Sequence, residues 1–464
     1  MESKALAESS FATTLDSKSL FMMIISSHQQ FDLFPTQTSN NPVLTSAQLK
    51  TARSGTFTDN MKLPVHRWFR YSAGFSADWV KQLIDNKSKT THLNLLDPFA
   101  GCGTTLLAGQ ACKVSCTGFE THPFVYKIAH AKLHWHIEPS ALWQTSEKLI
   151  ELAKKQLKPT QRLDIPLLNK CYTPENLAKL DALRNAYLEL EQNDDPIKEM
   201  IWLAITAILR ACSTAGTAQW QYVLPNKKKA KVLEPFIAFK EKIAQMVSDI
   251  VYIQQNQWGK NASILLTDAR QPQFEPPELF DLVITSPPYP NNYDYADATR
   301  LEMTFWGEIS GWKDLQSTVR QYLIRSCSQH SAAERLQLDT LLQAQILQPI
   351  KTELSNACQT LAEIRLTKGG KKTYHTMVAA YFQDLGQVFY SLRALCKENS
   401  TICFVIGDAA PYGVYLPVEK WLGQLALAAG FKSFSFEKLR DRNTKWKNRK
   451  HTVPLHEGRL WIEG

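Results

Sequence analysis

The segment ITSPPYPNNYDY (284–295) places a hydroxyl group, two prolines and an aromatic ring directly after a run of apolar residues. The apolar run is typical of a buried strand, and Pro287 and Pro288 cannot donate hydrogen bonds to a strand ladder. We therefore expect the strand to stop at Ser286 and a rigid loop to follow it. Such a loop would hold the Ser286 hydroxyl, the Pro287 carbonyl and the Tyr289 ring in fixed positions, which suits a site where a reacting group must be oriented.

A second candidate site is the glycine-rich segment LLDPFAGCGTT (95–105), about 180 residues upstream of the first. Gly101 and Gly103 lie between a predicted strand and a predicted helix, where glycine lets the backbone approach a ligand closely. The helix that follows offers unpaired amide groups at its N-terminus. The segment lacks the Lys-Ser/Thr pair of a phosphate-binding P-loop and the third glycine of the dinucleotide-binding fingerprint, so neither motif is matched.

Three acidic residues at the ends of predicted strands narrow the choice of ligand. Asp97 disfavours a phosphate group and favours a cationic one, Glu120 is placed to bind ribose hydroxyls, and Asp268 ends a third strand. A nucleoside joined to an amino acid fits these side chains. The sequence therefore predicts S-adenosylmethionine as the cofactor.

The segments DPFAGCGTT and TSPPY together resemble the motifs of DNA amino-methyltransferases, which transfer a methyl group from S-adenosylmethionine to an exocyclic nitrogen of cytosine or adenine. The resemblance covers roughly residues 61–138, 260–306 and 374–464. It implies cofactor contacts from Phe75, Asp97, Pro98, Phe99, Gly101, Gly103, Thr104, Glu120 and Asp268. It implies a catalytic loop made of Ser286, Pro287, Pro288 and Tyr289.

In the chemistry that this resemblance implies, the exocyclic amine is a weak nucleophile because its lone pair is delocalised into the base. Ser286 and the Pro287 carbonyl can accept hydrogen bonds from the amine, and Tyr289 can stack on a base rotated out of the duplex. Thr285-Ser286, in place of the aspartate of most adenine N6 enzymes, favours cytosine N4 as the target. The alternatives are adenine N6, an RNA base, a DNA-binding subunit with an inactive cofactor site, and an ordinary strand-ending turn.

The elements that must position these residues are predicted strands alternating with helices, which favours an α/β fold with a mostly parallel sheet. Strands near 433–440 and 451–463 are expected to form an antiparallel hairpin at its edge. The resemblance implies a Rossmann-like S-adenosylmethionine-dependent methyltransferase fold with large helical insertions, either of which could recognise the DNA sequence. The predicted units are a loosely ordered arm (1–60), the cofactor-binding half (61–138), a helical insertion (139–259), the catalytic part (260–309), a second helical insertion (310–373) and a C-terminal part with a basic hairpin (374–464).

Basic stretches at 226–231, 367–372 and 438–451 are candidate contacts to DNA phosphates, although each could also be a solvated loop. The last is the strongest candidate because arginines, an asparagine and a tryptophan are interleaved with its lysines. Arginine can read base edges, whereas lysine mostly binds phosphate. The predicted DNA-binding residues are Lys228, Lys229, Arg440, Arg442, Lys445, Trp446, Lys447 and Arg449.

The composition sets limits on the kind of protein. With 464 residues, 44% of them hydrophobic, and a formal net charge of +9, the chain can bury a core and attract an anionic partner such as double-stranded DNA. The nine cysteines include no Cys-x-x-Cys pair, and Cys112 and Cys116 have no matching ligand set, so we expect neither disulfides nor a metal site. No apolar run is long enough to span a membrane. We expect a bacterial cytoplasmic protein associated with the nucleoid through DNA, with a cognate restriction endonuclease as a further partner.

Overall fold

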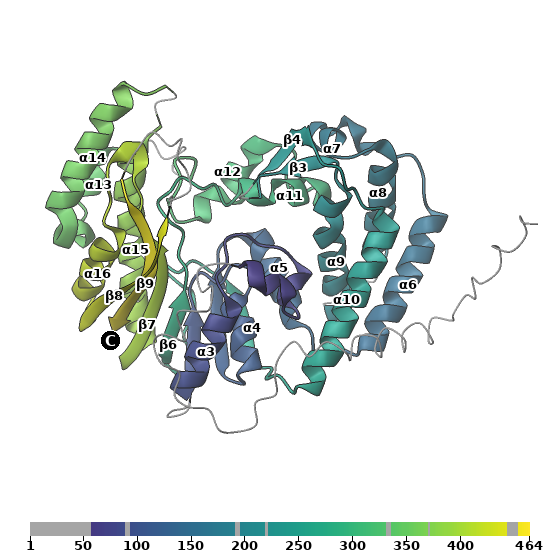
Figure 1. Ribbon diagram of the computed structural model, residues 1–464, viewed down its shortest axis with the longest axis horizontal. Coiled ribbons are helices and arrows are strands. Elements are labelled where there is room, and N and C mark those ends of the chain that lie inside the picture. The colour runs from purple at the N-terminus through teal and green to yellow at the C-terminus, as the bar shows by residue number, and fades with distance from the viewer. Residues whose placement is uncertain are drawn as a thin grey trace, which may run out of the picture.

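The computed structural model describes residues 57–88, 93–190, 195–218, 221–330, 336–369, 372–442 and 453–464. Its centre is a seven-stranded sheet with the strand order β5-β2-β1-β6-β7-β9-β8 (Figure 1). The strands from β5 to β7 are parallel to their neighbours, and β9 runs antiparallel to both β7 and β8. The predicted α/β class with a mostly parallel sheet is confirmed, and the arrangement is consistent with a Rossmann-like methyltransferase fold.

The strands fall close to the predicted positions. They are β1 (Asn94–Asp97), β2 (Ser115–Glu120), β5 (Ala262–Leu266), β6 (Phe280–Thr285), β7 (Cys396–Gly407), β8 (Ser433–Arg442) and β9 (Leu455–Glu463). The predicted antiparallel hairpin at the edge of the parallel strands is confirmed: β9 pairs with β7, and β8 is the outermost strand. Most residues of β9 are buried, whereas β8 alternates exposed and partly buried residues, so β8 is suited to the edge position.

Both faces of the sheet are buried, which explains why its inner strands are almost continuously apolar. Alternate residues of each strand enter different cores: Leu95 and Leu282 belong to one apolar cluster, and Leu96 and Val283 belong to the other. Helices α3 (Ala77–Ser88), α4 (Thr104–Ala111) and α5 (Pro123–Leu133) cover the first face, and α15 (Tyr374–Leu395) and α16 (Val418–Ala428) cover the second (Figure 1).

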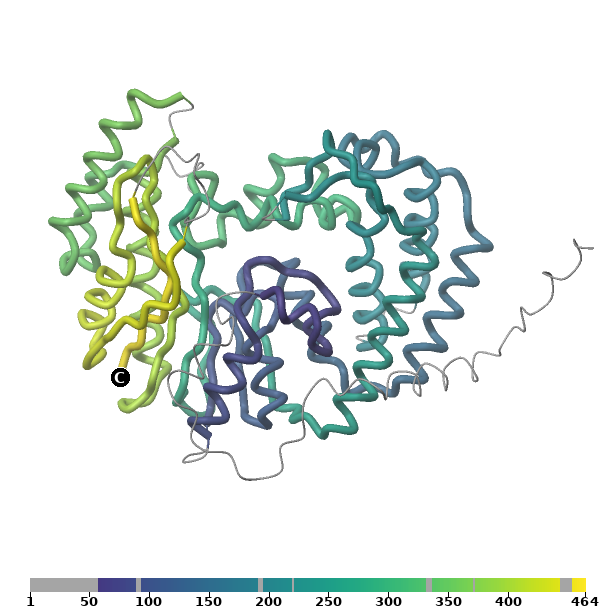
Figure 2. Tube along the Cα trace, viewed as in Figure 1, coloured from purple at the N-terminus to yellow at the C-terminus, as the bar shows by residue number. Residues whose placement is uncertain are grey.

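Between β2 and β5 the chain forms a bundle of long helices beside the first face of the sheet (Figure 2). Its members are α6 (Pro139–Lys155), α8 (Pro174–Leu188), α9 (Pro196–Cys212) and α10 (Pro235–Gln255). Each begins with proline, whose fixed φ and missing N–H suit the first helical turn. The short helix α7 (Pro166–Cys171) and a small antiparallel hairpin of β3 (Ala215–Thr217) and β4 (Val223–Lys228) complete this segment; the hairpin was not predicted.

A second excursion, between β6 and β7, consists mainly of shorter helices. These are α11 (Arg300–Trp306), α12 (Leu315–Thr318), α13 (Leu338–Leu342) and the longer α14 (Lys351–Leu366), with 3-10 turns between them. The two excursions match the helical character that the sequence predicted for these segments. The boundaries of the predicted units remain predictions, and most of the predicted arm (1–56) lies outside the described residues.

Two further findings bear on the composition. All nine cysteines are unpaired. In the part of the chain that the structure describes, no helix is both long enough and apolar enough to cross a membrane.

Leu282 lies on β6 at the centre of the sheet, and its side chain is 1% exposed. Replacing it with alanine should lower the free energy of unfolding by about 2–5 kcal/mol, because a cavity replaces buried methyl groups. Urea denaturation followed by circular dichroism measures this loss. Leu366→Ala is the matched control, since that side chain is 69% exposed and its removal should change stability by no more than about 0.5 kcal/mol. Equal effects of the two changes would contradict the description of this core.

Candidate active site

A cavity lies at the carboxyl ends of the parallel strands, where ligands bind in open α/β sheets. Its walls include residues that follow β1, β2, β5 and β6, so segments far apart in the sequence meet there. The site residues predicted from the sequence that line it are Phe75, Pro98, Phe99, Gly101, Glu120, Asp268, Ser286, Pro287, Pro288, Tyr289, Arg440 and Arg442. Asp97, Gly103 and Thr104 do not line it.

Glu120, the last residue of β2, is held by backbone groups. The amide of Gly101 donates to its Oε2 at 2.9 Å, and the amide of His122 donates to its Oε1 at 2.8 Å. Burial nevertheless raises the pKa of Glu120 to about 7. Gly101 and Gly103 have φ angles of 53° and 87°, a left-handed conformation that glycine adopts without strain. The carboxylate is thus fixed on the cavity wall with capacity to accept further hydrogen bonds.

Asp97 is fully buried behind the glycine-rich loop rather than on the cavity wall. Its Oδ1 accepts hydrogen bonds from the Thr285 hydroxyl at 2.6 Å and from the Phe99 amide at 3.1 Å. Burial raises the pKa of Asp97 to about 6. This side chain joins the ends of β1 and β6, and its predicted contact with a cofactor stays a prediction.

Gly103 and Thr104 lie where the glycine-rich loop joins helix α4. Gly103 caps the start of α4, and Thr104 is a buried residue in the first turn of that helix. Gly103 and Thr104 mark the start of helix α4, and neither residue lines the cavity.

Asp268 and Phe75 both line the cavity. The Asp268 carboxylate forms an ion pair with Arg270 at 2.6 Å, and Arg270 also lies 3.2 Å from Asp384. Phe75 is 5% exposed and packs edge-to-face on Trp79, with ring centroids 6.0 Å apart. Phe75 therefore belongs both to the core and to the cavity wall.

The loop after β6 presents its functional groups to the same cavity. The Ser286 hydroxyl donates to the Val405 carbonyl on β7 at 3.1 Å. The Arg442 guanidinium lies 5.3 Å from the centroid of the Tyr289 ring, within the range of a cation–π interaction. Burial raises the pKa of Tyr289, so its hydroxyl is neutral at physiological pH. A hydroxyl, a fixed backbone corner and an aromatic ring therefore surround one space.

Several residues that line the cavity were not predicted from the sequence: Tyr71, His122, Tyr295 and Glu457. Tyr71 lies in an aromatic-rich stretch, which was a usable signal. His122 is 2% exposed, and burial lowers its pKa to about 3. Glu457, on β9, forms an ion pair with Arg440 at 2.8 Å, and nothing in the sequence near it indicated a place in the site.

The candidate DNA contacts have mixed outcomes in the structure. Lys229 is partly buried, and its ammonium group donates to the carbonyls of Arg210 and Ala211 at the end of α9, so its contact with DNA stays a prediction. Lys228 is exposed, and its ammonium lies 3.2 Å from the Thr214 hydroxyl. Arg440 and Arg442 lie at the cavity. Lys445, Trp446, Lys447 and Arg449 lie outside the described residues.

Comparison with known proteins shows similarity over most of the chain. It is 28% identical over 408 residues to the Type II methyltransferase M.AvaI of Nostoc sp. strain PCC 7120, covering 81% of this chain and 80% of that protein. The chain is a Type II methyltransferase homologue. It is also 26% identical over 425 residues to the Type II methyltransferase M.BsoBI of Geobacillus stearothermophilus, with 82% of each protein covered.

A third relative aligns over a shorter stretch. The Type II methyltransferase M.MvaI of Kocuria varians is 23% identical over 253 residues, which is 51% of this chain and 55% of that protein. No protein-family model and no solved structure matches the chain. The relatives confirm the resemblance drawn from the two motifs at the level of a DNA methyltransferase family.

The hydrogen bond between Thr285 and Asp97 can be tested with Thr285→Val, which keeps the shape of the side chain and removes the donor. We expect the free energy of unfolding to fall by about 1–3 kcal/mol, because a buried carboxylate loses a partner. The Thr285 bond favours the charged carboxylate, so the loss should be largest above neutral pH and should shrink as the pH falls through the Asp97 pKa of about 6.

Chemical denaturation over a pH series measures this difference. Thr360→Val on the exposed side of α14 is the control, since the Thr360 hydroxyl donates only to the Asn356 carbonyl within its own helix. A Thr285→Val loss that is absent or independent of pH would contradict the role given to this bond.

Proposed function

We propose that the protein is a site-specific DNA methyltransferase that transfers a methyl group from S-adenosylmethionine to the N4 amine of a cytosine rotated out of the duplex. The names of its relatives support methylation of DNA in a restriction-modification system. The choice of N4 of cytosine is supported by Thr285-Ser286 before the two prolines. Adenine N6 is the alternative target, because both bases present an exocyclic amine.

The observation that carries the chemistry is the hydrogen bond from Ser286 to Val405. The Ser286 hydroxyl donates to a backbone carbonyl at 3.1 Å and is also hydrogen-bonded to the Tyr289 side chain, which leaves a lone pair of its oxygen to accept from an amine. The Pro287 carbonyl offers a second acceptor on the same rigid corner. Two fixed acceptors can bind both N–H groups of an amine and return electron density to its nitrogen without reorganising in the transition state.

The part of the cavity that Glu120 and Asp268 line fits a nucleoside joined to an amino acid. Glu120, with capacity beyond its two backbone partners, can bind ribose hydroxyls, and Asp268 can accept from an adenine amine. Phe75 and Tyr71 supply apolar surface to the same cavity. When bound, S-adenosylmethionine supplies a methyl group already activated by its sulfonium. The protein's part is then to align the amine with that methyl group and to exclude water.

The target base would stack on Tyr289, and Arg442, 5.3 Å from the centroid of that ring, would add positive charge close to the DNA backbone. We assign recognition of the DNA sequence to the helical excursions, with a cognate restriction endonuclease as a functional partner in a bacterial cytoplasm.

Mass spectrometry of nucleosides from cells that express the protein tests the target. We expect N4-methylcytosine in DNA. N6-methyladenine alone would replace the first proposal by its alternative, and methylation confined to RNA would overturn both.

Ser286→Ala tests the chemistry proposed for the catalytic loop. Loss of one preorganised polar group typically lowers the rate by about 10²–10³-fold, and we expect a similar loss of methyl transfer with unchanged binding of S-adenosylmethionine. Methyl transfer to a DNA substrate is measured with isotope-labelled cofactor, and binding by calorimetry. Ser433→Ala, at the exposed opposite end of β8 from Arg442, should leave both unchanged. Full activity of Ser286→Ala would refute the role of this hydroxyl.

The Glu120 pKa of about 7 predicts a pH dependence of cofactor binding. Ribose hydroxyls donate to the ionised carboxylate, so affinity should be full above this pKa and should decrease as the pH falls through about 7. Calorimetric titrations over this pH range measure the change. In Glu120→Gln the dependence should disappear and binding should weaken by about 1.5–3 kcal/mol, the value of a hydrogen bond to a charged group.

Glu419→Gln is the matched control for this titration, because burial also raises the pKa of Glu419 to about 7 but its side chain is not on the cavity wall. A pH profile that Glu419→Gln alters and Glu120→Gln leaves intact would contradict the assignment.

A further inference from the structure

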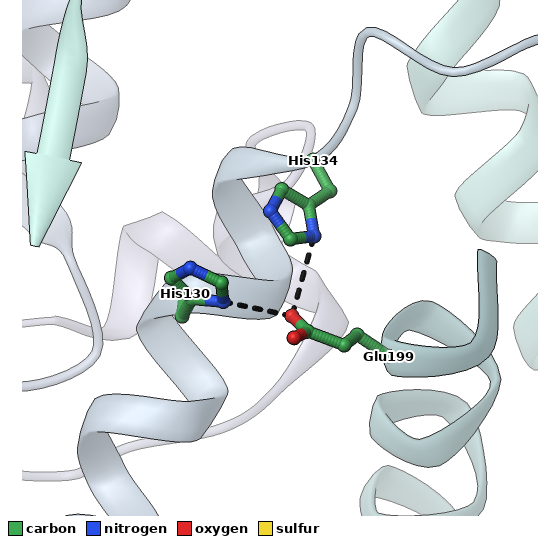
Figure 3. Close-up of side chains that lie close together, drawn as sticks. All are labelled: His130, His134 and Glu199. Carbon is green, nitrogen blue, oxygen red and sulfur yellow. Dashed lines mark hydrogen bonds and ion pairs between the residues drawn. The ribbon is translucent and has the colours of Figure 1, made fainter. Parts of the chain in front are cut away.

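We propose that His130, His134 and Glu199 form a binding site for a divalent transition-metal ion of the zinc class, which links helix α5 to helix α9. Figure 3 shows the two imidazole rings and the carboxylate directed toward one another across these helices. The site is separate from the proposed methyltransferase function and does not depend on it. We expected no metal site because Cys112 and Cys116 lack a matching set of ligands. That expectation did not take into account the His-x3-His pair of His130 and His134.

The spacing of the three groups suits one ion. His130 and His134 are one helical turn apart, so their side chains lie on the same face of the helix. The Nδ1 atoms of His130 and His134 lie 2.8 Å and 3.2 Å from Oε2 of Glu199, and one ligand atom from each residue lies within 4.8 Å of the others. Tetrahedral zinc with bonds of 2.0–2.1 Å places its ligand atoms about 3.3 Å apart. The two distances to Glu199 are within about 0.5 Å of that value, and the two imidazoles lie close enough to approach one ion by small side-chain rotations.

The chemistry of the ligands selects the ion. Two imidazoles and one carboxylate are a frequent zinc ligand set, whereas magnesium and calcium prefer oxygen ligands. The three side chains are 34%, 19% and 29% exposed in chain order, so an ion can reach them and water can occupy a fourth position. The rings are already oriented: Tyr126 stacks on His130 with centroids 5.5 Å apart, and His136 lies edge-on to His134 at 6.0 Å.

The positive groups near the site are directed elsewhere. The Lys127 ammonium lies over the Trp202 ring, 4.1 Å from its centroid. The Lys198 ammonium donates to the Leu190 carbonyl at 2.7 Å. The C-terminal end of α5, where both histidines lie, also carries the partial negative charge of the helix dipole, which favours a cation.

The position of the site indicates what a bound ion would do. His122 precedes α5 and lines the active-site cavity, and α9 carries Arg210, whose guanidinium pairs with Glu302 just after the catalytic loop. An ion bound between α5 and α9 would therefore clamp the helical bundle against the part of the chain that builds the cavity.

Zinc binding to the full-length protein tests the proposal. After treatment with a chelator, the protein is titrated with zinc at slightly alkaline pH, with a chromophoric chelator as competitor. We expect one tightly bound equivalent and a rise in the unfolding temperature when zinc is added. In Glu199→Gln and in His134→Asn the affinity should fall by more than the ~10–100-fold loss that is typical of changes outside the first ligand shell.

Controls separate this site from other zinc ligands. In the described part of the chain, a second cluster of possible metal ligands consists of Asp408, Glu419 and His456. His456→Asn disrupts that cluster and should leave the number of zinc ions bound per protein unchanged. The protein loaded with cobalt(II) should lack the thiolate charge-transfer band that binding at Cys102 or Cys112, the two partly exposed cysteines, would produce.

The proposal is overturned if the wild-type protein binds no stoichiometric zinc, or if zinc binding survives both Glu199→Gln and His134→Asn. The first result would mean that the three residues form only an ion-paired contact between helices. Should either variant fail to fold, His130→Gln on the most exposed of the three side chains gives the same test. Methylation activity is not the readout, so failure here leaves the proposed function unaffected.

Discussion

The parallel pairing of β1 with β6 is the constraint on which the rest of the site depends. Leu95 pairs with Leu282 and Leu96 with Val283, so the strands end side by side although they lie far apart in the chain. The buried hydrogen bond from Thr285 to Asp97 joins their ends at 2.6 Å. The glycine-rich loop and the Ser-Pro-Pro-Tyr loop leave the sheet at this junction. One sheet edge therefore brings the two loops, with the proposed cofactor-binding and amine-binding groups, to the same cavity.

Around this junction, hydrogen bonds within the protein fix the polar side chains, and each of these side chains can still accept a further hydrogen bond. Glu120 is fixed by two backbone amides and keeps acceptor capacity for ribose hydroxyls. The Ser286 hydroxyl donates to the β7 carbonyl of Val405 and is also hydrogen-bonded to the Tyr289 side chain. Pro287 and Pro288 within this corner restrict its backbone. This arrangement supports catalysis by positioning and electrostatics, which suits methyl transfer from an already activated donor.

The helical excursions are joined to the catalytic core through buried charge. Arg210 of α9 binds Glu302 after the catalytic loop, and Arg320 of the second excursion forms a bidentate pair with Asp294 within that loop's continuation. Arg320 and His330 hold the pKa of Asp294 down to about 2 against the effect of burial. Because removing one partner of such a pair leaves an uncompensated buried charge, these contacts stabilise the attachment of the excursions to the segment that follows the catalytic loop.

The sequence by itself determined the parts whose signals are local. Apolar runs placed the strands, the glycines and prolines placed both loops, and strand-ending acids identified Glu120 and Asp268, because each of these depends on neighbouring residues. Tertiary structure decided what depends on distant partners. Asp97 turned from the cavity toward Thr285 because β6 lies next to β1, and Lys229 binds the end of α9. Glu457 entered the site because β9 inserts between β7 and β8, a pairing that burial of both its faces favours and that no local pattern encodes.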